Sequence, residues 1–175
     1  MRKIYKPADG YDAFYQSYMD CVPEDGNLLQ HLKDITVETE NLATGLSEEK
    51  LTYRYSENKW TIKDVLLHLA DCERIIIYRA LRIARGDKTN LPGFDENFFV
   101  STAGANCRTV KSILEELALM RKASIFFIET LKDEALENSG MANGFKLSAK
   151  LFVNHLYGHH RHHLNIIKER YLQKG

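Results

Sequence analysis

The sequence lacks an excess of charge of either sign and is poor in cysteine. Lys plus Arg and Asp plus Glu number 24 each, so the formal net charge is zero. A neutral chain lacks the basic field that attracts nucleic acid or anionic lipid, so we expect no nucleic-acid or membrane partner. The 3 cysteines, Cys21, Cys72 and Cys107, are odd in number and widely spaced. This pattern favours free thiols in a reducing compartment over a disulfide framework.

Long hydrophobic runs are also absent. No apolar stretch approaches the roughly 18 residues that cross a bilayer as a helix, and the N-terminal residues lack the apolar centre of a secretion signal. We therefore expect a soluble, cytoplasmic protein. Hydrophobic residues still make up 44% of the chain and aromatic residues 10%, which supplies the core of a single domain spanning residues 1–175.

Proline is scarce, and two of the 3 prolines, Pro7 and Pro23, lie within residues 1–25. We interpret that stretch as a lead-in segment, because proline and its neighbouring glycines interrupt helices. Beyond it, apolar residues recur at helical spacing in four stretches, and Thr61 with Asp64 forms a capping pattern before the second. The predicted helices cover about residues 27–45, 61–86, 109–132 and 148–172. Strict alternation of apolar and polar residues occurs nowhere, so no strand is predicted.

The link between the second and third predicted helices is long. Asn90, Pro92, Gly93 and Gly104 mark residues 87–108 as an irregular crossover, in which residues 94–100 form a short helical piece. The other two links are short. Four helices connected in this way predict an all-α four-helix bundle.

Histidine is concentrated near the C-terminus, where five of the 7 histidines occur between positions 155 and 163. His159 and His163 are four residues apart and fall near the centre of the apolar arc of the last predicted helix. Because neutral imidazole is a common ligand of transition metals, this pair predicts a metal site. His68, two turns into the second predicted helix, is the natural third ligand. The alternative is that each inward histidine is a hydrogen-bonded core residue.

The remaining histidines of the cluster lie off that arc. We expect His160 and His162 to form a solvated surface patch and His155 to lie at a flank of the helix. Cys72 follows His68 by four residues, and its sulfur could also bind zinc, although an ordinary buried cysteine is the favoured interpretation.

Three stretches resemble motifs of the DinB-like superfamily, which includes a YfiT-type branch of metal-dependent enzymes. Residues 59–73, KWTIKDVLLHLADCE, are similar to a tryptophan-led motif that reaches the first histidine of the family. Residues 91–96, LPGFDE, are similar to its crossover motif, and residues 159–163, HHRHH, to its terminal H-x3-H. The matches occur in the family's order and cover most of residues 56–167.

The resemblance implies an up-down four-helix bundle, commonly a homodimer, with one divalent ion such as Zn²⁺ or Ni²⁺. By residue, His68, His159 and His163 match the three ligands. The crowded cluster leaves a second register open, in which His155 and His159 form the pair four residues apart.

Three protein ligands leave a coordination position open, which is the arrangement of a catalytic site. An activated water could attack an ester or amide, or an activated thiol could attack an electrophile. The family contains transferases that use bacillithiol or mycothiol, so the resemblance favours transfer of a low-molecular-weight thiol to an electrophilic substrate over hydrolysis. A third hypothesis is a non-catalytic metal-binding stress protein.

Few other residues suggest a role in catalysis. Asp71 and Glu73 follow His68 closely and could orient an imidazole or move a proton, but solvated helix charges are the preferred interpretation. In the crossover, Asp95, Glu96 and Phe98 could wall the metal end and select substrate, or only pack and solvate the loop. Trp60 is interpreted as a core anchor at the start of its helix.

Overall fold

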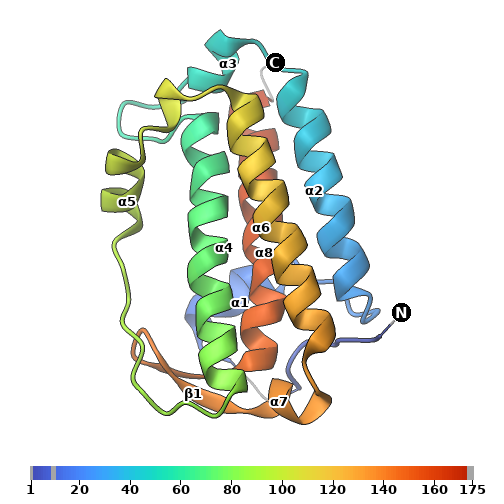
Figure 1. Ribbon diagram of the computed structural model, residues 1–175. Helices are drawn as coiled ribbons and strands as arrows, with labels where there is room; N and C mark the ends of the chain where they lie inside the picture. Colours follow the sequence, from blue (N-terminus) through green and yellow to red (C-terminus); the bar gives the residue numbers. More distant parts are fainter. Residues whose placement is uncertain (1, 9–10, 173–175) are drawn as a thin grey trace.

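The computed structural model describes residues 2–8 and 11–172. Its longest helices lie side by side as a bundle (Figure 1). They are α2 (Leu28–Thr44), α4 (Ile62–Ala84), α6 (Val110–Thr130) and α8 (Ala149–Ile166), and α8 continues into the short η2 (Ile167–Leu172). In Figure 1, α2 and α8 run upward whereas α4 and α6 run downward. The predicted all-α four-helix bundle is confirmed, and the long crossover is what allows α4 and α6 to run parallel.

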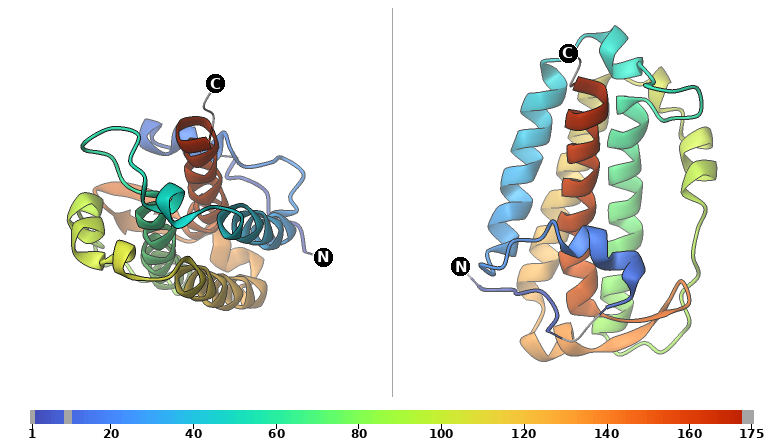
Figure 2. Two further views of the ribbon diagram at one scale, coloured as in Figure 1. Left: turned by 90° about the horizontal axis from the view of Figure 1, so that it is seen from above. Right: turned by 180° about the vertical axis from the view of Figure 1, so that it is seen from behind.

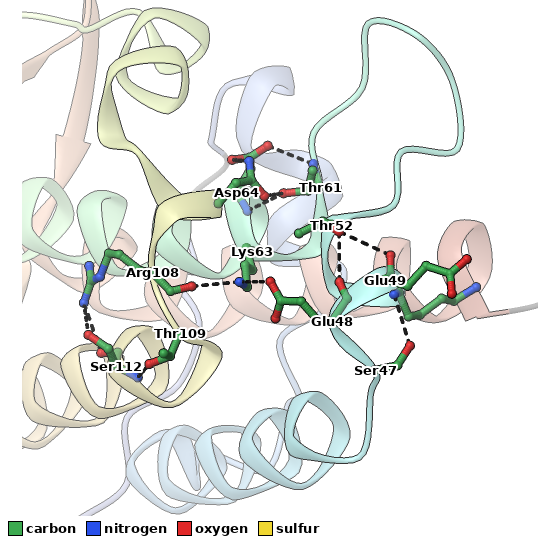
Figure 3. Close-up of polar contacts among 12 residues, drawn as sticks. Ser47, Glu48, Glu49, Thr52, Thr61, Lys63, Asp64, Arg108, Thr109 and Ser112 are labelled. Atoms are coloured by element: carbon green, nitrogen blue, oxygen red, sulfur yellow. Dashed lines mark hydrogen bonds and ion pairs between the residues drawn. The ribbon is translucent and has the colours of Figure 1, made fainter.

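Polar side chains fix the start of α4. Thr61 and Asp64 form the predicted capping box, in which the Asp64 N–H donates to the Thr61 hydroxyl (3.0 Å) and the Thr61 N–H donates to the Asp64 carboxylate (2.9 Å; Figure 3). Lys63 is buried beside it and donates to the carbonyl of Arg108 (2.7 Å; Figure 3). Since Thr109 caps α6, this bond ties the start of α4 to the start of α6.

The crossover lies along one side of α4 (Figure 1) and contains α5 (Glu96–Ala103) and η1 (Ala105–Cys107). The short helix predicted over residues 94–100 is therefore present, displaced toward the C-terminus. Asp95 begins α5 by accepting a hydrogen bond from the Phe98 N–H (3.0 Å). Upstream, the Leu91 N–H donates to the Met141 carbonyl (2.9 Å), which anchors the crossover.

The prediction that the chain contains no strand was wrong. β1 (Ser139–Ala142) and β2 (Phe145–Ser148) form an antiparallel hairpin before α8. Its turn is Asn143 (φ 51) and Gly144 (φ 82), and positive φ at both central residues is the conformation that Asn-Gly favours in hairpins. The Asn-Gly pair was the available signal, because strands of four residues are too short to show alternation.

The predicted lead-in segment contains α1 (Ala13–Met19), a short helix that lies across α8 in the right-hand view of Figure 2. Asp12 caps it by accepting from the Phe14 N–H (2.9 Å). Tyr15 and Met19 are buried, so this segment supplies part of the core. The short helices α3 (Glu48–Thr52) and α7 (Asp133–Glu137) complete the connections.

The buried apolar residues form two clusters, one at each end of the bundle. Between them the four long helices place buried polar side chains at the same level, which are Thr39, His68, Glu73, Arg121, His159 and His160. This polar layer contains two of the predicted metal ligands, His68 and His159. None of the described helices is long and apolar enough to cross a membrane.

Candidate metal centre

Two of the three predicted ligands meet across adjacent helices. His68 on α4 and His159 on α8 are both buried, and their Nε2 atoms lie 3.2 Å apart. The His163 ring lies one turn further along α8, with its centroid 4.9 Å from that of His68 and 4.5 Å from that of His159. The structure therefore brings the three predicted residues together in the polar layer.

The spacing of the two Nε2 atoms suits a metal ion. Zinc–nitrogen bonds of about 2.0–2.1 Å at tetrahedral angles place two ligand nitrogens roughly 3.3–3.4 Å apart. The observed 3.2 Å is close to that value, and it also permits a hydrogen bond between one ring N–H and the other ring's lone pair. Burial lowers the pKa of His68 to about 4 and that of His159 well below its usual range. Both imidazoles are therefore neutral and carry a lone pair that a metal ion can use.

Cys72 also belongs to the centre. The donor atoms that lie within 4.8 Å of one another are those of His68, Cys72 and His159. The Cys72 sulfur is 3.5 Å from both ring nitrogens of His68, so it lies to the side of either lone pair. Burial raises the pKa of the Cys72 thiol to about 12. The ring nitrogens of His163 have no hydrogen-bond partner among the described residues, and its ring is stacked near Trp60 at 6.2 Å.

His155, expected at a flank, is buried next to the centre. It is 8% exposed, and neither of its ring nitrogens has a hydrogen-bond partner in the described chain. Burial lowers its pKa to about 3. Tyr15 and Tyr18 of α1 cover it, with ring centroids 5.1 Å and 4.9 Å away. The His155 ring centroid is 5.6 Å from that of His159, whereas the His163 centroid is 4.5 Å from it. The spacing therefore favours the pair of His159 and His163 over the alternative pair of His155 and His159.

The prediction of a solvated patch was wrong for His160. Its Nδ1 accepts a hydrogen bond from Arg121 (3.0 Å), and its Nε2 lies 2.8 Å from the Thr39 hydroxyl. Because the Thr39 hydroxyl already donates to a backbone carbonyl, His160 carries its proton on Nε2. His162 is half-buried and packs against Tyr18 at 5.1 Å. Neither ring is a free surface group.

The two candidate carboxylates are engaged elsewhere. Glu73 was interpreted as a solvated charge, yet it is 2% exposed and accepts bonds of 2.9–3.1 Å from the Arg121 guanidinium. Asp71 is half-buried and pairs with Arg74 at 3.4 Å. Burial raises the pKa of Asp71. Within residues 2–8 and 11–172, neither carboxylate has a hydrogen bond to a histidine of the centre.

A cavity of about 170 Å³ opens beside the three histidines. Trp60, interpreted from the sequence as a core anchor, forms one wall and donates from Nε1 to Asn97 (3.2 Å). Of the crossover candidates, Glu96 lines the cavity, Asp95 caps α5, and Phe98 faces away from it into solvent.

Several cavity-lining residues were missed by the sequence analysis, among them Tyr15, Tyr18 and Arg79. Tyr15 and Tyr18 come from the segment interpreted as a lead-in, and nothing in the sequence placed that segment against α8. Arg79 was within reach of the periodicity argument, because it lies eleven positions after His68 and therefore on the same face of α4.

Gly158→Ala is expected to destabilise the protein, because a Cβ at this position would lie 2.3 Å from the Tyr18 carbonyl oxygen. The same change inside an exposed helix would stabilise it by about 1 kcal/mol. We expect a loss of about 1–3 kcal/mol in the free energy of unfolding, measured by urea denaturation. Gly45→Ala is the control, since its nearest contact would be 3.6 Å. Equal effects of the two changes would contradict the close packing of α1 on α8.

Fold and centre together define a class of protein: a helical bundle with a histidine-lined cavity in its polar layer. The DinB superfamily matches residues 31–167, and the chain belongs to this superfamily. Membership confirms the resemblance that the sequence motifs indicated.

Similar proteins carry names that refer to metal. A protein of Oceanobacillus iheyensis is 28% identical over 143 residues, which cover 78% of this chain and 81% of that protein. One of Geobacillus thermodenitrificans is 26% identical over 133 residues, 75% of each chain. Both are named "putative metal-dependent hydrolase". The solved structure of YfiT from Bacillus subtilis, described as "a probable metal-dependent hydrolase with an unusual four-helix bundle topology", covers 97% of this chain and is itself covered to 95%. Its TM-score of 0.70 at 16% identity shows the same fold.

Proposed function

We propose that this protein is a metal-dependent hydrolase in which His68, His159 and His163 hold one divalent ion, Zn²⁺ or Ni²⁺. The observation that carries the proposal is the 3.2 Å approach of two neutral imidazole nitrogens at the wall of a cavity. His163 is assigned as the third ligand because it matches the terminal H-x3-H motif of the superfamily and its ring nitrogens have no hydrogen-bond partner in the described chain. By distance between donor atoms, Cys72 is the competing third ligand, since its sulfur groups with the ring nitrogens of His68 and His159.

A divalent ion bound there would lower the pKa of a water molecule and polarise a substrate carbonyl. Hydrolysis joins the water oxygen to the acyl carbon and breaks the ester or amide bond, and the proton passes to the leaving group. The protein's part is to orient the substrate and exclude bulk water. Trp60 and Tyr18 supply ring faces for this, at centroid distances of 4.6 Å from His68 and 5.6 Å from His159.

The names of two relatives, which refer to hydrolases, favour hydrolysis over thiol transfer. Transfer of a low-molecular-weight thiol is the second candidate, since the same three imidazoles would serve it.

The proposal is tested with para-nitrophenyl acetate and protein loaded with Zn²⁺ or Ni²⁺. We expect turnover that needs the metal, stops after chelation, returns when metal is restored, and is independent of added thiol. Turnover of an electrophile that requires and consumes a thiol would replace the hydrolase with the transferase. Stoichiometric metal binding that only raises the melting temperature, without turnover of either kind, would support the non-catalytic alternative. The homodimer stays a prediction, for which light scattering is the direct measurement.

A further inference from the structure

The far end of the cavity from His68 contains a buried cation without a counter-ion. Arg79 is 7% exposed and lines the cavity, and no carboxylate pairs with it among the described residues. One of its five N–H groups donates to the Pro92 carbonyl (2.7 Å), and the guanidinium lies 5.9 Å from the centre of the Phe94 ring. A buried charge is costly to leave unpaired, so this end of the cavity is suited to an anion.

Two further unpaired polar groups lie at the same end. Tyr15 is 2% exposed, lines the cavity, and its hydroxyl has no hydrogen-bond partner in the part of the chain that the structure describes. His155 packs edge-on against the Tyr15 ring, and both of its nitrogens are unpaired. Buried polar groups in proteins are normally hydrogen-bonded, so the two unpaired ring nitrogens of His155 call for a partner. Arg79 and the Tyr15 hydroxyl line the same cavity with donors that no described residue accepts, so together the three side chains suit an anionic ligand.

The helices place these donors on the same stripe as the metal centre. His68, Cys72, Ile76 and Arg79 follow one another along α4 at spacings of four, four and three and all line the cavity. At 1.5 Å per residue the Cα atoms of His68 and Arg79 are about 16 Å apart, and helical side chains lean back toward the N-terminus, which brings the guanidinium toward Cys72. One molecule in the cavity can therefore face the histidines at one end and Arg79 at the other.

We propose that Arg79, with Tyr15 and His155, binds the carboxylate of a small ester or amide substrate whose scissile group faces the three histidines. A singly charged carboxylate fits because Arg79 supplies one positive charge. The negative charge of Glu96, which lines the same cavity, disfavours a ligand with two negative charges. The guanidinium fork matches a carboxylate, and a small group is enough to fill the cavity volume of about 170 Å³. The cleavage of this substrate rests on the proposed hydrolase function, whereas the binding of its carboxylate does not.

The test is the affinity of the purified protein for benzoate compared with that for neutral benzamide, measured by isothermal titration calorimetry. Charge-assisted hydrogen bonds predict that benzoate binds about 10–100-fold more tightly and that Arg79→Gln abolishes this preference without changing metal content. Tyr15→Phe, a change of one hydroxyl, should weaken benzoate by about 2–10-fold. The matched control is Arg74→Gln, which removes the same charge from a residue of α4 that pairs with Asp71 and Glu116 and does not line this cavity.

The outcomes separate this inference from the hydrolase proposal. A benzoate preference that survives Arg79→Gln would overturn the subsite and assign the carboxylate to another cation, including a bound metal. Loss of the preference in both Arg79→Gln and Arg74→Gln would also overturn it, as a net-charge effect. Arg79-dependent benzoate binding in a protein that binds no metal and hydrolyses no ester would uphold the subsite while the hydrolase proposal fails. Circular dichroism of each variant verifies folding.

Discussion

His159→Ala is expected to remove the bound metal, from about one ion per chain to a trace, as measured by mass spectrometry of untagged protein offered Zn²⁺ or Ni²⁺. Loss of a group that merely orients a ligand lowers metal affinity by about 10–100-fold, and loss of the ligand itself should lower it further. His159 is central, because its Nε2 is the atom that faces His68 and its ring is the nearest to His163. Zn²⁺ should raise the melting temperature of the wild type and leave that of the variant unchanged.

His31→Ala is the control for this experiment, since His31 pairs with Asp25 on the surface of α2 at 2.9 Å and lies outside the centre. Two further variants identify the third ligand. His163→Ala should lower metal content as His159→Ala does, whereas Cys72→Ala should retain it. The reverse result would make Cys72 the ligand. Full metal content in His159→Ala would contradict the centre itself.

Glu73→Ala is expected to lower the free energy of unfolding by about 3–5 kcal/mol, because it leaves the Arg121 guanidinium buried without its carboxylate. Arg121 is 3% exposed and also donates to His160 and to the Leu32 carbonyl, so it cannot turn toward solvent without breaking the polar layer. The measurement is urea denaturation of the protein with and without metal.

Asp71→Ala is the matched control, because it removes a carboxylate from the same helix whose partner, Arg74, is itself exposed to solvent. Exposed pairs contribute about 0–1 kcal/mol, so this change should have little effect on stability. Since Glu73 has no hydrogen bond to the candidate ligands among the described residues, metal content should stay at the wild-type level in the Glu73→Ala protein that remains folded. A loss no larger than that of Asp71→Ala would show that Arg121 finds another partner.

Much of the bundle followed from periodicity and caps. The apolar spacing located the four long helices, and the Thr61 pattern located the start of α4, because both signals are local in the sequence. Periodicity also selected His68, His159 and His163, since a helix face is a property of spacing. The hairpin was missed because its strands are short and the Asn143-Gly144 signal was interpreted only as a break.

The error at His160 has a different cause. A helix that is exposed on one side has a solvated arc, and residues off the apolar centre fall on it. In α8, every residue from 151 to 160 is buried, because α1, α2 and α4 cover the helix from several directions (Figure 2). The roles of His155 and Tyr15 could not be predicted for the same reason: they depend on where α1 packs against α8, and the periodicity of a single helix carries no information on its tertiary contacts.

The packing of α1 on α8 also constrains how the chain reaches its native state. Tyr18 and Gly158 are 140 residues apart in the sequence, and their backbones approach so closely that a Cβ on Gly158 would lie 2.3 Å from the Tyr18 carbonyl oxygen. A ribosome releases α1 long before α8, so the aromatic face of α1 stays uncovered while the intervening helices are synthesised. Contacts of such long sequence separation form late, because the entropy of closing the loop must be overcome first. We therefore expect the cavity wall to be completed late in folding, so that an incompletely folded chain has no enclosed site in which to bind or react.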